Sequence, residues 1–223
     1  MAGKLYIVST PIGNYGDMTF RAVETLRSVD LIACEDTRKT GILLKHFEIE
    51  AKLFSYHDHN ENFKTEVLVE RLKSGENIAV VSDAGTPCIS DPGFRIVRAA
   101  RENGVEVEGV PGACAAINAL VLSGMPTDSF VFEGFLPHKK GRKTKLAALC
   151  DERRTVVLYE SVHRIIKLLQ ELTELIPERK ICLMREMTKT YEEHSCGIPS
   201  EIHRIYSEKA PKGEFVVVIE GKR

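Results

Sequence analysis

The sequence predicts an α/β protein with two domains, each built from a sheet and its covering helices. Between residues 5 and 124, short apolar runs alternate with segments of helical spacing, which is typical of parallel strands with crossover helices. The run Ile78–Val81 is apolar without alternation, as in a strand buried on both faces. A turn-rich stretch, Met125–Asp128, precedes a second set of strands and helices. We therefore expect one domain over residues 1–124 and another over 125–223.

The elements of the first domain follow from the period of the apolar residues. The expected strands are short β-rich runs: Leu5–Val8, Asp30–Cys34, Lys52–Ser55, Ile78–Val81 and Val105–Val110. The expected helices have one apolar face and end at turn residues: 20–29, 40–47, 63–75, 91–104 and 111–124. In the fourth helix, Asp91 is the expected N-cap and Pro92 the first helical residue.

The second domain shows the same alternation of short β-rich runs and segments with one apolar helical face. Its expected strands are Phe130–Phe132, Thr155–Tyr159, Ile181–Met184 and Phe215–Ile219. Its expected helices are Lys143–Asp151 and Ile165–Leu175, and Pro177 stops the second of them.

Composition excludes several classes of protein. The 223 residues are 43% hydrophobic and 28% charged, as in ordinary globular proteins, and the net charge of −1 gives no general attraction to polyanions. No stretch approaches ~18 apolar residues and the N-terminus lacks an apolar leader, so we expect no membrane partner. Six cysteines without a Cys-x-x-Cys pair predict free, mostly buried thiols in a reducing cytoplasm.

Four polar loops, three of which contain glycine, follow strands of the first domain and should meet at one edge of its sheet: 10–19, 35–38, 82–93 and 111–116. Ligands of open α/β sheets bind at this edge. In the third loop, Ala84 and Gly85 would let a ligand approach the main chain, and Asp83 can accept hydrogen bonds from ribose or ammonium groups. An ordinary βα turn explains the same spacing. A cleft between two α/β halves is a common small-molecule site, and we expect the site there.

Clustered charges give further candidates. Lys139–Lys145 holds five basic residues in seven positions, which would neutralise phosphates or simply form a solvated face. Glu35–Arg38 would serve acid–base chemistry or helix capping. His57-Asp58-His59 has no third ligand nearby, so we expect a polar loop and no metal site. Two segments after second-domain strands, Tyr159–Arg164 and Arg185–Lys189, would form ion pairs or part of the site.

Seven short motifs occur in a fixed order along the chain. They are Thr10–Asn14, Glu35–Arg38, Ser82–Gly93, Val110–Gly112, Gly134–Pro137, Tyr159-Glu160 with His163-Arg164, and Arg185-Glu186 with Thr188-Lys189. Together they resemble the small-subunit ribosomal RNA cytidine 2′-O-methyltransferases of the tetrapyrrole methylase superfamily, from Lys4 to about Gly221.

The resemblance implies two α/β domains with S-adenosylmethionine in the cleft between them, and a homodimer in the cytoplasm. It implies methyl transfer to the ribose 2′-oxygen of a cytidine in the decoding region of small-subunit (16S) rRNA. Naked rRNA and the assembled ribosomal subunit both stay open as substrates.

The resemblance also implies the cofactor contacts, and we expect the other two groups of residues below from the chemistry of such a methyl transfer. The cofactor contacts would be Pro11, Gly13, Asp83, Ala84, Gly85, Ile89, Ser90, Ala113, Cys114, Ala115, Tyr159 and Lys212. The residues acting on the substrate would be Glu35, Arg38, His57, Arg185, Glu186 and Lys189, with the general base among Glu35, His57, Glu186 and Lys189. The RNA contacts would be Lys139, Lys140, Arg142, Lys143, Lys145 and Arg164.

Four positions depart from the family pattern: Tyr15, Cys114, Val162 and Met187. Cys114 stands where serine is usual and would remove a hydroxyl hydrogen bond to the ligand. Many members also carry a further helical C-terminal segment, so RNA contacts made by such a segment are not expected here. Two alternatives stay open: a tetrapyrrole (precorrin-type) C-methyltransferase, and a non-catalytic RNA-binding protein of ribosome assembly.

Overall fold

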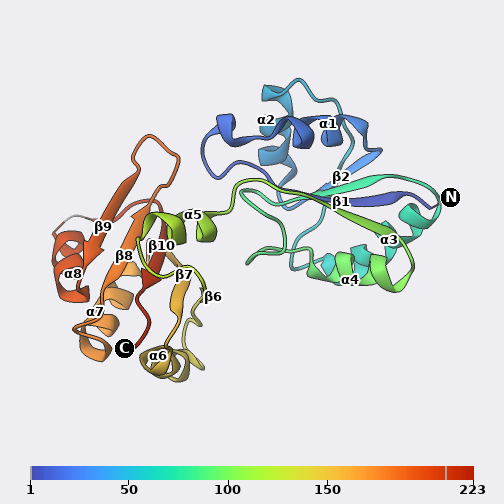
Figure 1. The fold of residues 1–223 in the computed structure, drawn as a ribbon. Coiled ribbons are helices and arrows are strands. Elements are labelled where there is room, and N and C mark those ends of the chain that lie inside the picture. The colour runs from blue at the N-terminus through green and yellow to red at the C-terminus, as the bar shows by residue number, and fades with distance from the viewer. Residues whose placement is uncertain (1, 209) are drawn as a thin grey trace. The chain divides into compact units, whose positions relative to one another are not determined.

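The computed structural model describes residues 2–208 and 210–223, which form two compact units with a sheet and a core each (Figure 1). The first unit has five parallel strands in the order β3-β2-β4-β1-β5. Their bounds are β1 Lys4–Val8, β2 Leu31–Cys34, β3 Leu53–Ser55, β4 Ile78–Val81 and β5 Glu106–Val110. The parallel sheet and all five expected strands are confirmed.

Two pairs of helices cover the sheet of the first unit. The helices α1 (Phe20–Ser28) and α2 (Thr37–His46) lie on one face, and α3 (Glu61–Lys73) and α4 (Phe94–Glu102) on the other (Figure 1). The chain therefore leaves β1 and β2 toward one face but β3 and β4 toward the opposite face. Because β4 lies between β1 and β2, its following loop occupies a topological switch point, where ligands of open α/β sheets bind.

The start of α4 differs from the prediction. Asp91 and Pro92 belong to the preceding loop, and the helix begins at Phe94 after Gly93, whose φ is +134°. The N–H of Cys88 donates to the carbonyl of Pro92 (3.3 Å), which closes the loop before the helix can start. A Cβ at position 93 would lie 2.7 Å from the Cys88 sulfur, so only glycine fits there.

The second unit has a mixed sheet in the order β6-β7-β10-β8-β9, in which only β6 and β7 run parallel. Its strands are β6 Phe130–Phe135, β7 Thr155–Ser161, β8 Ile181–Arg185, β9 Glu193–Gly197 and β10 Glu214–Ile219. Its helices are α5 Ala115–Leu122, α6 Arg142–Asp151, α7 Ile165–Leu175 and α8 Pro199–Ser207. The strand β9 and the helix α8 were not predicted. Among the helices of residues 2–208 and 210–223, none has the length and apolar character that spanning a bilayer requires.

The division between the units lies ten residues before the expected one. The first unit ends at Cys114 and the second begins at Ala115, because α5 packs against β7 and β10. The N–H of Ala116 on this helix donates to the hydroxyl of Tyr159 on β7 (3.1 Å). The sequence pattern placed α5 with the strand before it, since the pattern shows that a helix exists but not which sheet it covers.

The expectation of six free thiols is wrong for two cysteines. Cys182 and Cys196 form a disulfide, while Cys34, Cys88, Cys114 and Cys150 are free. The bonded pair lies directly opposite each other on the antiparallel strands β8 and β9. Because β9 was not predicted, the sequence offered no partner for Cys182.

Candidate functional site

The loop after β4, Ser82–Gly93, is bonded to the loops on both sides of it; we call it the β4 loop. It meets the loop after β1 through a two-residue bridge. The N–H of Thr10 donates to the carbonyl of Gly85 (2.9 Å), and the N–H of Gly85 donates back to the carbonyl of Thr10 (3.1 Å). The Thr10 hydroxyl also donates to the carbonyl of Ser82 (3.2 Å). The predicted meeting of these two loops is confirmed.

Asp83 connects the β4 loop to the end of β2. One carboxylate oxygen accepts the N–H of Asp36 (3.0 Å), and the other pairs with the Lys39 ammonium (2.8 Å). Asp36 is itself the N-cap of α2, where it accepts the N–H of Arg38 (2.9 Å) and pairs with the Arg38 guanidinium. The capping interpretation of Glu35–Arg38 is therefore confirmed. Lys39 completes this junction and was missed, because a lysine on the first turn of a helix gives no signal of its own.

Hydroxyl groups connect the β4 loop to the loop after β5. Thr86 donates from Oγ1 to the carbonyl of Ala113 (3.0 Å), and its hydroxyl is also 3.0 Å from that of Ser9. Ser9 in turn contacts Gly112 so closely that a Cβ there would lie 2.8 Å from the serine Cβ. The ends of β1, β2, β4 and β5 are thus joined into one surface of main chain and short polar side chains.

The backbone of the β4 loop adopts conformations that most residues avoid. Gly85, Cys88 and Ser90 have φ values of +80°, +71° and +61°. Left-handed residues outside glycine cost about 1–3 kcal/mol each and cluster at functional sites. A Cβ on Gly85 would lie 3.2 Å from the Ile12 side chain, while Ala84, Ile89 and Ser90 are exposed. The loop therefore presents three exposed residues, while Gly85 itself is buried against the neighbouring loops.

Carboxylates give this edge a negative potential. Burial raises the pKa of Glu35, and the nearby charges of Asp83 and Asp58 raise it further. Burial also raises the pKa of Asp91 to about 6, with a second contribution from Glu35, although a hydrogen bond with Ser82 opposes the shift. Such an edge favours a cationic ligand over a phosphate. The coupling of Asp91 to Glu35 was missed, because Asp91 looked like a helix cap.

The pKa of Asp91 predicts a cost to stability that appears as the pH rises. Below pH 3.8, its ordinary pKa, the carboxyl is neutral in the folded and unfolded chain; above about 6 the folded chain must hold a half-buried carboxylate. With solvent screening allowed for, Asp91→Asn should raise the free energy of unfolding by about 1–2 kcal/mol at pH 7.5 and leave it unchanged near pH 4. Urea denaturation at both pH values measures this difference, with the exposed Asp128→Asn as the control. An equal gain at both pH values would contradict the shift.

His57 lies near the same edge but is tied to its own turn. Its Nε2 is 2.8 Å from the Asn60 amide nitrogen, and its main-chain N–H donates to the Asn60 side-chain oxygen (2.9 Å). Its Nδ1 is buried and has no hydrogen-bond partner. Within the described ranges, no group of three or more His, Cys, Asp or Glu side chains is placed to hold a metal ion.

In the second unit, Glu186 and Lys189 join the end of β8 to the start of β10. The Glu186 carboxylate accepts the Lys189 ammonium (2.9 Å) and the N–H of Glu214 (3.0 Å). Lys189 also pairs with the Glu214 carboxylate (2.6 Å). Gly213, with a φ of +93°, lies against the Glu186 side chain and leaves no space for a Cβ. Arg185 donates from Nε to the carbonyl of Lys212 (2.6 Å), so these predicted site residues form one cluster.

The charges of this cluster argue against both of its candidates for a general base, Glu186 and Lys189. Burial disfavours the Lys189 ammonium, but the Glu214 and Glu186 carboxylates outweigh it and raise the pKa of Lys189. Burial likewise opposes ionisation of Glu186, but Lys189 and the Glu214 N–H outweigh it and lower the pKa of Glu186. Lys189 is therefore protonated at neutral pH, and Glu186 is a carboxylate already engaged by its cation. Neither state favours proton removal from a hydroxyl.

Tyr159 lies on β7 with its hydroxyl bonded to the start of α5. Its ring makes edge contacts with Phe132 and Phe135, at centroid distances of 5.1 and 5.6 Å. The aromatic side chains and the bond to Ala116 hold Tyr159 in one position beside Ala115. Tyr159 and Ala115 thus lie together in the second unit, whereas Ala113 and Cys114 belong to the first.

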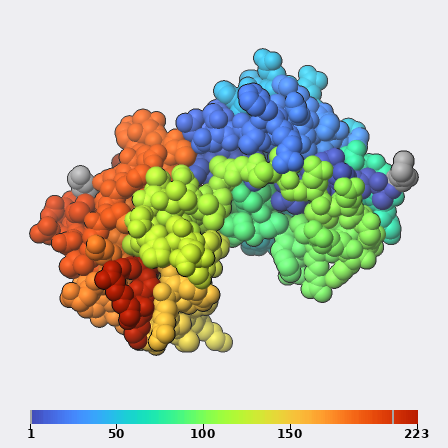
Figure 2. All heavy atoms as spheres, in the orientation of Figure 1, coloured from blue at the N-terminus to red at the C-terminus, as the bar shows by residue number. Residues whose placement is uncertain are grey.

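In the predicted basic patch the four lysines lie at the surface, whereas Arg142 does not. Lys139, Lys140, Lys143 and Lys145 are exposed, in the segment coloured yellow in Figure 2. The side chain of Arg142 is only 5% exposed and pairs with the Glu171 carboxylate (2.6 Å). Helical spacing explains the difference, because Arg142 shares a face of α6 with the buried residues Leu146 and Leu149.

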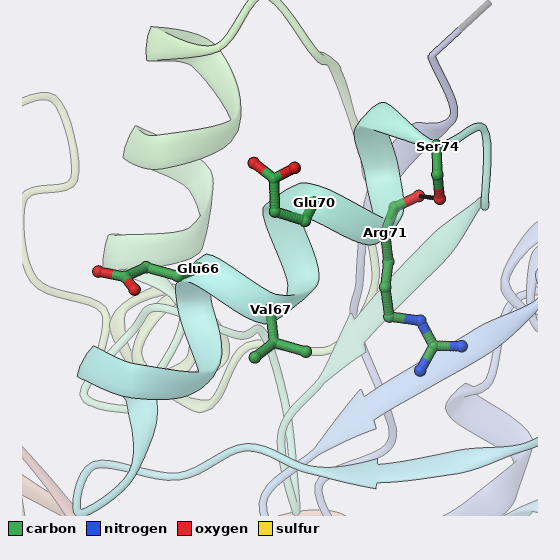
Figure 3. A pocket seen from close by; sticks show the side chains of 5 residues that line it. All are labelled: Glu66, Val67, Glu70, Arg71 and Ser74. Carbon is green, nitrogen blue, oxygen red and sulfur yellow. Dashed lines mark hydrogen bonds between the residues drawn. The ribbon is translucent and has the colours of Figure 1, made fainter.

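A shallow depression of about 530 Å³ lies along α3 (Figure 3). Its lining residues are Glu66, Val67, Glu70, Arg71 and Ser74. Arg71 forms an ion pair with Glu76 (2.6 Å). The other charged residues of the lining are Glu66 and Glu70. It includes none of the predicted site residues.

Comparison with known proteins identifies a family with which the chain shares its sequence pattern, and a group of relatives that are similar over nearly the whole chain. A family model described as tetrapyrrole (corrin/porphyrin) methylases matches residues 4–196. Proteins named ribosomal RNA small subunit methyltransferase I are similar over nearly the whole chain. The one from Haemophilus influenzae is 52% identical over 100% of this chain and 80% of its own length. The one from Thermotoga maritima is 44% identical over 99% of both.

Solved structures extend the comparison to more distant proteins. Uroporphyrin-III C-methyltransferase from Thermus thermophilus, complexed with S-adenosylhomocysteine, has a TM-score of 0.67 at 17% identity, covering 98% of this chain and 97% of that one. The methyltransferase CobJ has a TM-score of 0.72 at 18% identity, covering 100% and 97%. At these identities the likeness concerns the fold. The expected fold class is thereby confirmed, and the chain belongs to the tetrapyrrole (corrin/porphyrin) methylase family.

Proposed function

We propose that this protein transfers a methyl group from S-adenosylmethionine to the 2′-oxygen of a cytidine ribose in small-subunit rRNA. The observation that carries the proposal is the 44–52% identity, over nearly the full chain, to relatives named as small-subunit rRNA methyltransferases. The relative from Thermotoga maritima matches along 99% of its own length, so the similarity includes both units and all seven motifs.

The β4 loop and its neighbours would hold the methyl donor. The exposed residues Ala84, Ile89 and Ser90 are open to a ligand, the buried Gly85 holds the loop in place, and the loop after β5 adds Ala113 and Cys114. When bound, S-adenosylmethionine supplies a methyl group that is activated by a positively charged sulfur. Burial is the main cause of the raised pKa values of Glu35 and Asp91, and the neighbouring carboxylates that raise them further would suit such a cation. Pro11, Gly13, Tyr159 and Lys212 remain predicted donor contacts.

Glu35 is the general base that the surroundings favour. It follows β2 at the switch-point edge, and burial raises its pKa from 4.5 toward the working pH, where a base is most effective. Glu186 and Lys189 are engaged with each other, so they would position the substrate, and Arg38 and Arg185 would hold flanking phosphates. His57 has a buried ring nitrogen without a hydrogen-bond partner, and it would help to fix the conformation of the chain around Glu35. Proton removal of this kind contributes about 10²–10⁴-fold, and alignment of the reacting atoms can contribute more.

The exposed lysines Lys139, Lys140, Lys143 and Lys145 would bind the RNA backbone. Unstacked nucleotides are the usual targets of sequence-specific RNA readers, so a single-stranded or opened target is expected. We also infer that the protein acts in the cytoplasm as a homodimer, which sedimentation of the purified protein would test.

Transfer of a labelled methyl group to alternative acceptors tests the proposal. Small ribosomal subunits or their free rRNA should accept the label, and a uroporphyrinogen-type acid should not. The opposite preference would favour the tetrapyrrole C-methyltransferase, whose carboxylate substrate could use the same lysines. Binding of rRNA without any transfer would favour the non-catalytic assembly protein.

A further inference from the structure

Two arginines and two glutamates form a cluster of ion pairs in the second unit, consisting of Arg142, Glu160, Arg164 and Glu171. Arg164 pairs with Glu160 (2.7 Å) and Arg142 pairs with Glu171 (2.6 Å), while Arg142 and Glu160 face each other at 3.6 Å. The Glu160 side chain is fully buried, and those of Arg142 and Arg164 are 5% and 14% exposed. The four formal charges balance, and the exposed Lys167 adds a longer pair with the half-buried Glu171 (4.0 Å).

The cluster joins three elements around one loop. Glu160 lies on β7, Arg164 is the N-cap residue of α7, and Arg142 is the first residue of α6. The N–H of Ser161 donates to Glu160 Oε1 (2.8 Å), which fixes the carboxylate against its own strand. Removing one member would leave a buried charge without its partner, which is costly.

Both arginines also reach the loop between β6 and α6. Arg164 donates from Nη1 to the carbonyl of Leu136 (2.8 Å), and Arg142 donates from Nη1 to the carbonyl of Pro137 (3.4 Å). These consecutive carbonyls are separated from the exposed residues Lys139 and Lys140 by His138 alone. Gly134 at the end of β6 and Gly141 before α6 have φ values of +59° and +85°, so the chain turns at a glycine on each side of the bonded carbonyls.

We infer that Arg142, Glu160 and Arg164 are positioning residues that hold the 136–141 loop in the conformation that binds rRNA, without touching a phosphate themselves. The inference rests on the proposed function and assigns these three residues a role different from the RNA contact expected of the two arginines. A guanidinium already neutralised by a carboxylate displaces no counterion when RNA binds, whereas each exposed lysine that meets a phosphate does. The two kinds of residue therefore differ in salt dependence.

The test measures the Kd of purified small subunits at several salt concentrations, with kcat and the affinity for S-adenosylmethionine measured alongside. Arg142→Lys and Arg164→Lys should raise Kd and KM for the subunit by about tenfold or more, with the slope of log Kd against log salt unchanged. Lys139→Ala and Lys140→Ala should each reduce that slope by about 0.7–0.9. The kcat at saturating subunit and the donor affinity should stay within about twofold of wild type in all four variants.

Arg179 provides a matched control for general destabilisation. It is a half-buried arginine of the same unit, and it donates to the carbonyls of Leu149 (2.8 Å) and Glu220 (2.8 Å) at the opposite end of α6. Arg179→Lys should lower the unfolding midpoint much as Arg142→Lys does, but leave the Kd unchanged. An equal rise in Kd for Arg179→Lys would overturn the inference, as would a reduced salt slope for Arg142→Lys or Arg164→Lys.

Amide hydrogen exchange separates this inference from the proposed function. Residues 136–141 should exchange faster in Arg142→Lys and Arg164→Lys than in wild type or Arg179→Lys, whether or not RNA is the ligand. Unchanged exchange in that loop would overturn the positioning role. A wild-type protein that binds no small subunit would instead refute the proposed function, and the exchange result would still decide the role of the cluster.

Discussion

Gly85→Val is expected to weaken the binding of S-adenosylmethionine by at least about tenfold. It should also lower the free energy of unfolding by roughly 2–4 kcal/mol. The φ of +80° at this residue is unfavourable for any side chain and most unfavourable for a β-branched one. A Cβ would also lie 3.2 Å from the Ile12 side chain and 3.6 Å from the carbonyl of Ala113. The substitution therefore pushes apart the loops after β1, β4 and β5, which together form the proposed donor site. Isothermal titration calorimetry with the donor and urea denaturation measure the two effects.

Gly104 provides the matched control for this substitution. It has a similar φ of +71°, but a Cβ there would meet nothing within 4 Å. Gly104→Val should thus carry the backbone cost alone and bind the donor as wild type does. A Gly85→Val protein that is folded and keeps its donor affinity would remove the β4 loop from the donor site.

Replacing Lys139, Lys140, Lys143 and Lys145 by glutamate should weaken binding of the small ribosomal subunit by at least about 100-fold at moderate salt. All four side chains are exposed, so the substitution alters the surface charge without opening the core. Lys145 forms an ion pair with Glu133 (2.6 Å), and exposed pairs of this kind contribute little to stability. The affinity for S-adenosylmethionine should be unchanged. Filter binding at several salt concentrations and donor calorimetry provide the measurements.

The control for that variant changes the net charge equally at another place. Lys45, Lys52, Lys73 and Lys222 are also exposed, and their replacement by glutamate gives the same total charge. This control should lose only the small part of the affinity that depends on net charge. If both variants lost the same affinity, the 139–145 surface would have no special role in RNA binding.

The first unit could be predicted almost completely from the sequence because its signals are local and agree with one another. Ile78–Val81 is a strand with the predicted bounds, and the polar segments after β1, β2, β4 and β5 do meet at one edge. Parallel topology brings such segments together whatever the details of the side chains. The sequence could not show that Asp83 bonds to Asp36 and Lys39, because that contact depends on how β2 and β4 are placed side by side.

The misses in the second unit have different physical causes. β9 is the edge strand Glu193–Gly197, and its sequence, EHSCG, has almost no β-branched or aromatic residues, so propensity gives no strand signal. The helix α8 did carry a signal, with Pro199 at its first position and Ile202 and Tyr206 four residues apart. Arg142 was assigned by its charge, but its place on the inner face of α6 decides its surroundings. Helical spacing from Leu146 and Leu149 would have shown that it faces inward.

Mass spectrometry of small-subunit rRNA from cells with and without this protein tests the proposed activity most directly. Nuclease digestion of the rRNA should reveal one cytidine in the decoding region with a methyl group on its ribose. The account predicts that this modification disappears when the protein is removed, and returns with the wild-type chain but not with Gly85→Val. An unchanged set of ribose methylations, or the loss of a methyl group from a base instead, would contradict it.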